Sequence, residues 1–147
     1  MLTQQEFDDI RNQQKKFETN EVIVLGPHPI KWSRTLKSIV TRDTFVFDFS
    51  RNSAIKVSKY SCNKRYHGSI VIFRYCSDKP HTNPPEKGGA HFPSAHIHIY
   101  EEGFDDKVAH DPLEIGIEPG FTMAQVMGKI FDYLNIINAP QIQTDLF

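Results

Sequence analysis

Alternating histidines in one short stretch are the residues whose types and spacing best suit chemistry. The stretch 91–100 ends in His-Ile-His-Ile-Tyr, so His96, His98 and Tyr100 share one side of an extended strand and the isoleucines lie on the other. Two imidazoles with pKa values of about 6.5 can serve as proton acceptor and proton donor at neutral pH. We therefore predict a functional site on this strand.

One chemistry open to such a pair is metal-independent cleavage of RNA, on the scale of a small toxin-like ribonuclease. One histidine would remove the proton of the ribose 2′-hydroxyl and the other would protonate the leaving oxygen. A basic group, for which Arg74, Lys64 and Arg65 are candidates, would stabilise the charge on the phosphorane. The predicted catalytic set, which needs no cofactor, is His96, His98, Tyr100 and Arg74.

The charge distribution supports a polyanionic partner. Residues 31–77 hold ten basic and two acidic residues, a net charge of +8, whereas the rest of the chain carries −9. Basic side chains interleaved with aromatic rings suit RNA or single-stranded nucleic acid. The alternative is that the lysines only solvate the outer face of a sheet. The predicted nucleic-acid-binding residues are Arg51, Lys56, Lys59, Lys64, Arg65 and Tyr66.

The same strand could hold a metal ion, because two imidazoles on one strand face are common ligands. The set would be His96, His98 and Glu102. Together with Gly89 this spacing is similar to the first metal motif of cupins, with one extra residue before the first histidine. The strand is also similar to that of histidine-triad nucleotide hydrolases. That resemblance implies a nucleophile at His98, with Tyr100 in the position of the third histidine.

A broader pattern, His-x-His-x-Tyr-x-Glu-Gly at 96–103, resembles a small family of uncharacterised bacterial and phage proteins. The resemblance implies a mobile-element setting and supplies no mechanism. It leaves room for a non-catalytic interaction or inhibitor protein that binds another macromolecule through its divided charge. Histidines on the wet face of a strand, or hydrogen-bonded beneath a loop, also need no function at all.

The elements that position this strand belong to one domain covering residues 1–147. The chain is long enough for one hydrophobic core and too short for two ordinary domains. Capping boxes at Thr3 with Glu6 and at Thr122 with Gln125 predict a helix at each end. We expect the apolar stripe of the first helix to continue to Phe17.

Between the helices, period-two alternation predicts the strands of an antiparallel sheet. The fold class is therefore α+β, with a sheet of about six strands flanked by an N-terminal and a C-terminal helix. Residues 77–95 are rich in Pro and Gly and are expected to form a long loop. The predicted strands are 22–25, 30–40, 45–49, 55–58, 69–76 and 95–100, with a weaker one at 113–117.

Two features point to the cytoplasm and away from a membrane. The first ten residues lack the basic and apolar regions of a signal peptide, and no apolar run approaches the roughly 18 residues that span a bilayer. Cys62 and Cys76 are too few for a disulfide framework and lack the C-x-x-C spacing of a zinc site. We interpret both cysteines as ordinary strand residues.

Overall fold

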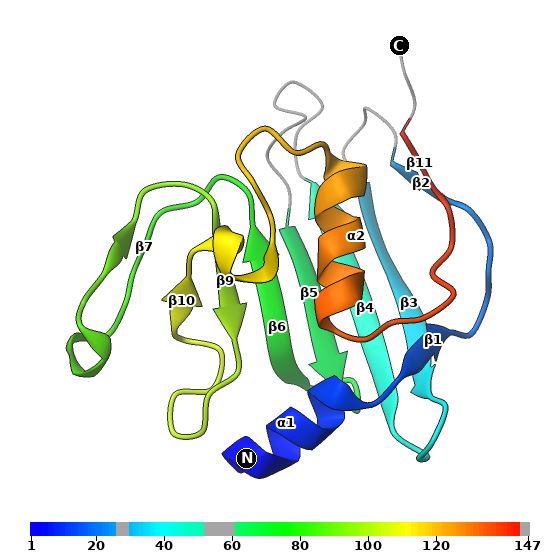
Figure 1. The fold of residues 1–147 in the computed structure, drawn as a ribbon, viewed down its shortest axis with the longest axis horizontal. Helices are drawn as coiled ribbons and strands as arrows, with labels where there is room; N and C mark the ends of the chain where they lie inside the picture. Colours follow the sequence, from blue (N-terminus) through cyan, green and yellow to red (C-terminus); the bar gives the residue numbers. More distant parts are fainter. Residues whose placement is uncertain (26–29, 52–60, 145–147) are drawn as a thin grey trace.

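The main feature of the fold is an antiparallel sheet with helices on one face (Figure 1). The computed structural model describes residues 1–25, 30–51 and 61–144. Within these ranges the sheet has seven strands in the order β1-β3-β4-β5-β6-β9-β10, with every neighbouring pair antiparallel. They are β1 (Lys15–Phe17), β3 (Ile30–Ser38), β4 (Thr44–Arg51), β5 (Ser61–Tyr66), β6 (Ile70–Cys76), β9 (His96–Ile99) and β10 (Ala109–His110).

Two short strand pairs are separate from this sheet. Among the described residues, β2 (Ile23–Leu25) pairs in parallel with β11 (Ile142–Thr144), and β7 (His81–Thr82) pairs with β8 (His91–Phe92). The α+β class is confirmed. The expectation of one sheet of about six strands was wrong in detail, because the described part of the chain forms a seven-stranded sheet and two short pairs.

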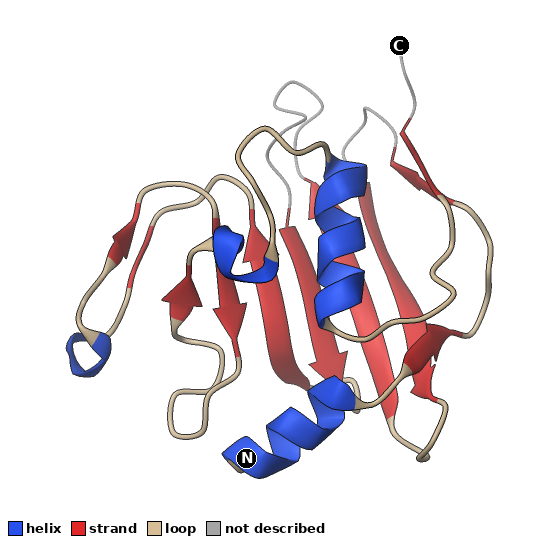
Figure 2. Ribbon diagram, in the orientation of Figure 1, coloured by secondary structure: helices blue, strands red, loops and turns tan. Residues whose placement is uncertain are grey.

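Two helices, α1 (Gln4–Asn12) and α2 (Met123–Tyr133), lie across the same face of the sheet (Figure 2). Both predicted capping boxes are present, with the Thr3 and Thr122 side chains each accepting a hydrogen bond from the backbone of the third helical residue. A capping box satisfies amide groups that a helix start otherwise leaves without partners. No helix in the described ranges is long and apolar enough to cross a membrane.

Alternating phenylalanines form the floor of the core beneath α2. Phe45, Phe47 and Phe49 are fully buried, while the residues between them lie on the other face of β4. The Phe131 ring of α2 lies 5.3 Å from the Phe47 ring and 5.6 Å from the Phe17 ring, both edge to face. Such pairs favour burial of one face of the sheet against the helix.

The first helix ends earlier than predicted. It stops at Asn12, and Lys15–Phe17 pairs with β3 as strand β1. Phe17 is buried, as expected, but from a strand. A predicted weak strand at 113–117 was also wrong, because Pro112–Ile115 forms the 3-10 helix η2, begun by the Asp111 side chain. The proposed strand at 55–58 lies outside the described residues.

Residues 77–95 are more ordered than a loop. Strands β7 and β8 form a hairpin closed by the 3-10 helix η1 (Pro85–Lys87), and the hairpin extends beside β9 and β10 (Figure 1). Asn83 fastens it to the sheet edge, since its amide donates to the Ala109 carbonyl at 2.9 Å and accepts from the Ala109 amide at 2.7 Å. The segment predicted to be a long loop thus contains a short strand pair and a 3-10 helix.

Candidate metal centre

The pairing of β6 with β9 creates the candidate site. In this antiparallel pair Cys76 lies opposite His96, and Arg74 lies opposite His98. Directly opposed residues point to the same face of a sheet. These four side chains therefore share the face away from the helices, whereas Ile97 packs in the core.

Three potential metal ligands meet on that face. One ligand atom from each of Cys76, His96 and His98 lies within 4.8 Å of the others. Cys76 is 8% exposed to solvent, and each histidine is 1% exposed. The ring centroids of the two histidines are 4.8 Å apart, at 75° to one another.

The hydrogen bonds of the two imidazoles leave one nitrogen of each ring available. Nδ1 of His96 lies 3.0 Å from the Ser94 carbonyl, an arrangement that makes Nδ1 the donor and leaves the lone pair on Nε2. Nδ1 of His98 is buried and has no hydrogen-bond partner among the described residues. A buried polar atom without a hydrogen-bond partner lowers the free energy of unfolding by on the order of 1–3 kcal/mol.

Burial sets the charge of the cluster. It lowers the pKa of His98 to about 3, with the positive charge of Arg74 and the neighbouring His96 ring acting in the same direction. It also lowers the pKa of His96, against the effect of the Ser94 carbonyl. Both imidazoles are therefore neutral at neutral pH, which is the protonation state that binds metals.

The pKa of the Cys76 thiol shifts in the opposite direction. Burial raises the pKa of Cys76, and the nearby charges of Arg74 and Lys79 only partly oppose this. Cys76 is consequently a thiol at neutral pH, and a bound cation would release its proton. The sequence predicts only an ordinary strand position for Cys76, because its pairing with His96 joins segments twenty residues apart and no C-x-x-C spacing marks it.

Tyr100 does not lie beside the histidines, contrary to the prediction. Its ring stacks on Phe7 of α1 at 5.6 Å, and its hydroxyl donates to the Leu2 carbonyl at 2.7 Å. The pairing of β6 with β5 skips Ile72, and the Tyr100 amide donates to the Ile72 carbonyl. This bulge interrupts the alternation of faces at Ile72, and Tyr100 follows the last residue of β9; both side chains belong to the core.

Glu102 is also absent from the cluster. Its carboxylate accepts a hydrogen bond from the Gln4 amide at the start of α1, at 2.7 Å. The predicted set of His96, His98 and Glu102 was therefore wrong in its third member, and Cys76 occupies that place among the described residues.

Arg74 does lie next to the histidine pair, as the catalytic hypothesis required. It is the pairing partner of His98, and its Nη2 lies 3.7 Å from Asp106 Oδ2. Its Nε is buried without a hydrogen-bond partner among the described residues. A partly exposed positive charge is thus held beside His98 on β6, an interior strand of the sheet.

The predicted nucleic-acid-binding residues do not form one described surface. Arg51 points to the same side of β4 as the three phenylalanines and is only 2% exposed. Its Nη1 lies 3.7 Å from Met123 Sδ. The Tyr66 hydroxyl donates to Asp43 at 3.1 Å. Of the others, Lys56 and Lys59 lie outside the described residues, and only the backbone of Lys64 and Arg65 is described, within strand β5.

A cleft of about 630 Å³ lies on the helix side of the sheet. Its described lining is largely apolar and includes Tyr75, Ala95, Pro112, Phe121 and Met123. None of the predicted catalytic residues is among the described residues that line it. The histidine pair and this cleft are therefore on opposite faces.

Comparison with known proteins gives a family without a mechanism. No curated protein and no solved structure matches the chain. A family model does match, and it covers residues 2–136, from the residues before α1 to three residues past the end of α2. The chain therefore belongs to DUF6978, a family of unknown function.

Proposed function

We propose that this chain is a metal-binding protein that holds a divalent cation of the zinc class between β6 and β9. The observation that carries the proposal is the buried trio of Cys76, His96 and His98, whose ligand atoms lie within 4.8 Å of one another. One thiolate and two imidazoles are ligands that select zinc and related transition metals over Mg²⁺ or Ca²⁺.

Two further contacts support a metal rather than a simple buried cluster. The Ser94 carbonyl accepts from Nδ1 of His96 and so directs Nε2 toward the trio, as the outer hydrogen bonds of metal-bound histidines do. Nδ1 of His98, buried without a hydrogen-bond partner in the described part of the chain, would gain one in the cation. Binding deprotonates Cys76, and the proton passes to solvent.

Titration of the purified, metal-stripped chain with Co²⁺ tests this proposal. We expect one ion per chain and a sulfur-to-metal charge-transfer band. Cys76→Ser should abolish the band, and His98→Gln should weaken binding by about tenfold or more, which corresponds to about 1.4 kcal/mol. His91→Gln is the matched control, because His91 bonds to Thr82 on the far side of β8.

The result that overturns the proposal is equally specific. If the wild-type chain binds no Co²⁺ or Zn²⁺, the trio is only a packed cluster. The same conclusion follows if Cys76→Ser leaves the charge-transfer band intact. A folded near-ultraviolet circular dichroism spectrum of each variant ensures that lost binding reports lost ligands.

Metal-independent cleavage of RNA is the second candidate, and the position of Arg74 opposite His98 favours it. Both rings are only 1% exposed, so a phosphodiester would reach them only after the β7–β8 hairpin moved aside. The test is cleavage of single-stranded RNA in excess chelator. Activity that disappears in His96→Ala and in Arg74→Ala supports this candidate, and activity unchanged in both removes it.

A further inference from the structure

We infer that His81, carried by the β7–β8 hairpin, is the fourth ligand that closes this centre into a Cys-His-His-His site. The inference rests on the proposed metal-binding function and specifies the kind of site. Four protein ligands around zinc are typical of structural centres, whereas catalytic centres keep one position for water. The hairpin would then be held to the sheet by the metal.

The three imidazoles already form one cluster. The His81 ring centroid lies 4.7 Å from that of His98, edge to face, and 5.5 Å from that of His96, nearly parallel. In the hairpin His81 pairs with Phe92, whose ring is 6.2 Å from His96. The face of the hairpin that bears His81 and Phe92 therefore covers the two buried histidines.

The backbone of the hairpin is fixed independently of the metal. Asn83 exchanges two hydrogen bonds with Ala109 on β10, the strand next to β9. Farther along, Lys87 pairs with Glu101 at 2.6 Å and lies over the Phe104 ring. Closure of the centre consequently needs at most a rotation of one side chain, and no rearrangement of the segment.

His81 has a contact that it can exchange for the metal. Its Nε2 lies 3.1 Å from the Lys107 carbonyl, and the ring is half-buried, unlike the two sealed rings behind it. It can keep this contact and coordinate through Nδ1, or rotate and coordinate through Nε2. Either way it approaches from the solvent side, the direction from which a fourth ligand would complete a tetrahedron.

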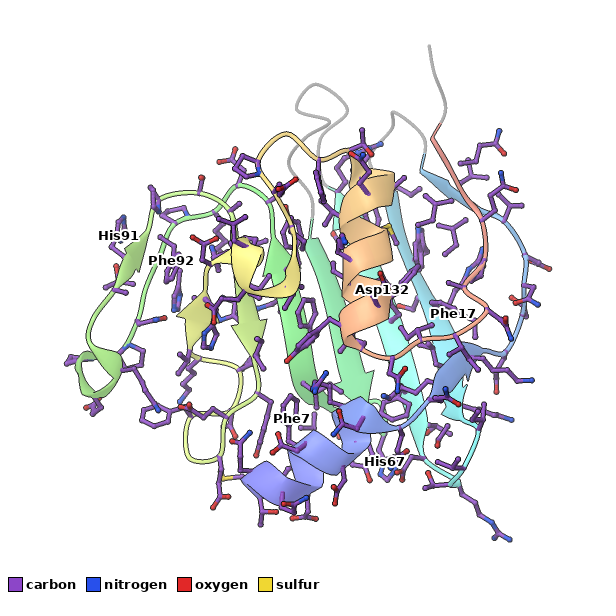
Figure 3. All side chains as sticks on the ribbon, in the orientation of Figure 1. Phe7, Phe17, His67, His91, Phe92 and Asp132 are labelled. Atoms are coloured by element: carbon purple, nitrogen blue, oxygen red, sulfur yellow. The ribbon has the colours of Figure 1, made fainter. Side chains whose placement is uncertain are left out.

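The opposite side of the hairpin provides an internal control. His91 lies one strand away and is paired with Thr82, so its ring points away from the cluster and contacts the Thr82 hydroxyl at 2.7 Å. Figure 3 shows His91 and Phe92 on opposite sides of β8. A change at His91 alters the same hairpin without touching the centre.

The experiment compares the Co²⁺ forms of the full chain as wild type, His81→Gln and His91→Gln, with and without azide. In the wild type and in His91→Gln, four protein ligands leave no position for azide, and the visible spectrum should not change. His81→Gln should keep the thiolate band but bind Co²⁺ at least about tenfold more weakly, since loss of even an outer partner of a ligand has an effect of that size. Its spectrum should shift when azide enters the vacated position.

Two outcomes overturn the inference. If azide shifts the wild-type spectrum as it shifts that of His81→Gln, the fourth position is open and His81 is not a ligand. If His81→Gln binds Co²⁺ as tightly as His91→Gln does, the conclusion is the same. In both cases the thiolate band persists and the metal-binding proposal stands, whereas a missing band in the wild type removes the proposal and the inference together.

Discussion

At the scale of single residues, the Asp43 carboxylate, away from the candidate centre, forms hydrogen bonds with several polar side chains. Asp43 Oδ1 lies 3.1 Å from both His67 Nε2 and the Tyr66 hydroxyl, and Oδ2 lies 3.3 Å from Gln13 Nε2. Burial acts to raise the pKa of Asp43, but these hydrogen bonds outweigh it and the net pKa is lowered. The ionised carboxylate is therefore a stabilising group of the folded state.

Asp43→Asn should reduce the free energy of unfolding by about 1 kcal/mol at pH 7. Because the folded-state pKa lies below the unfolded value, the contribution of Asp43 is present above the unfolded pKa and is lost as pH falls through the folded pKa. Urea titrations from pH 7 to pH 3 should thus show the wild type losing its advantage over the variant. Asp132→Asn, on the exposed side of α2, is the control, and an equal pH dependence there would contradict the assignment.

At the scale of elements, a buried lysine joins the two helices to the first strand. Lys15 is fully buried, and its Nζ donates to the carbonyls of Arg11, Gln13 and Leu134 at 2.6–2.9 Å. Two of these carbonyls lie at the end of α1 and the third follows α2. The carbonyls at a helix end lack intrahelical partners, so one ammonium group satisfies both ends.

Lys15→Met should lower the free energy of unfolding by roughly 2–4 kcal/mol, since it leaves carbonyls at both helix ends without their donor. Lys16→Met is the matched control, because Lys16 is the next residue of β1 and is exposed. Its effect should stay within about 0.5 kcal/mol. Similar losses in the two variants, measured by urea unfolding, would show that the ammonium group does not join the helices.

The elements that were predicted correctly are those whose signals are local. A capping box spans four residues, and the alternation of Phe45, Phe47 and Phe49 lies within one strand. Strand β5 was missed because Ser61–Tyr66 is polar and has no apolar alternation, and its place between β4 and β6 comes from pairing. Pairing also decides which residues meet Cys76, so the third ligand could not be read from spacing.

At the scale of the whole molecule, the two faces of the sheet have different roles. The helices and the phenylalanines form the hydrophobic core on one face, while the candidate centre lies on the other, near the β10 edge. That edge strand is only two residues long and is joined to the hairpin through Asn83. A cation bound there would connect β6, β9 and the hairpin on the face away from the main core cluster.

Zinc should therefore stabilise the whole chain. A ligand that binds only the folded state at 100 times its Kd adds about 2.7 kcal/mol, which should raise the Tm by roughly 5–10 °C for a chain of this length. Mg²⁺ should have no effect, because it prefers oxygen ligands.

Thermal unfolding followed by circular dichroism measures this shift, and amide hydrogen exchange locates it. Cys76→Ser should show no zinc-dependent rise in Tm, and zinc should slow exchange in β7 and β8 of the wild type. In His81→Gln the rise in Tm should shrink and the protection of the hairpin should be lost, while exchange in β4 stays unchanged. If zinc raised the Tm of Cys76→Ser as much as that of the wild type, the cation would bind elsewhere. The β7–β8 hairpin would then be held at the sheet edge without a metal.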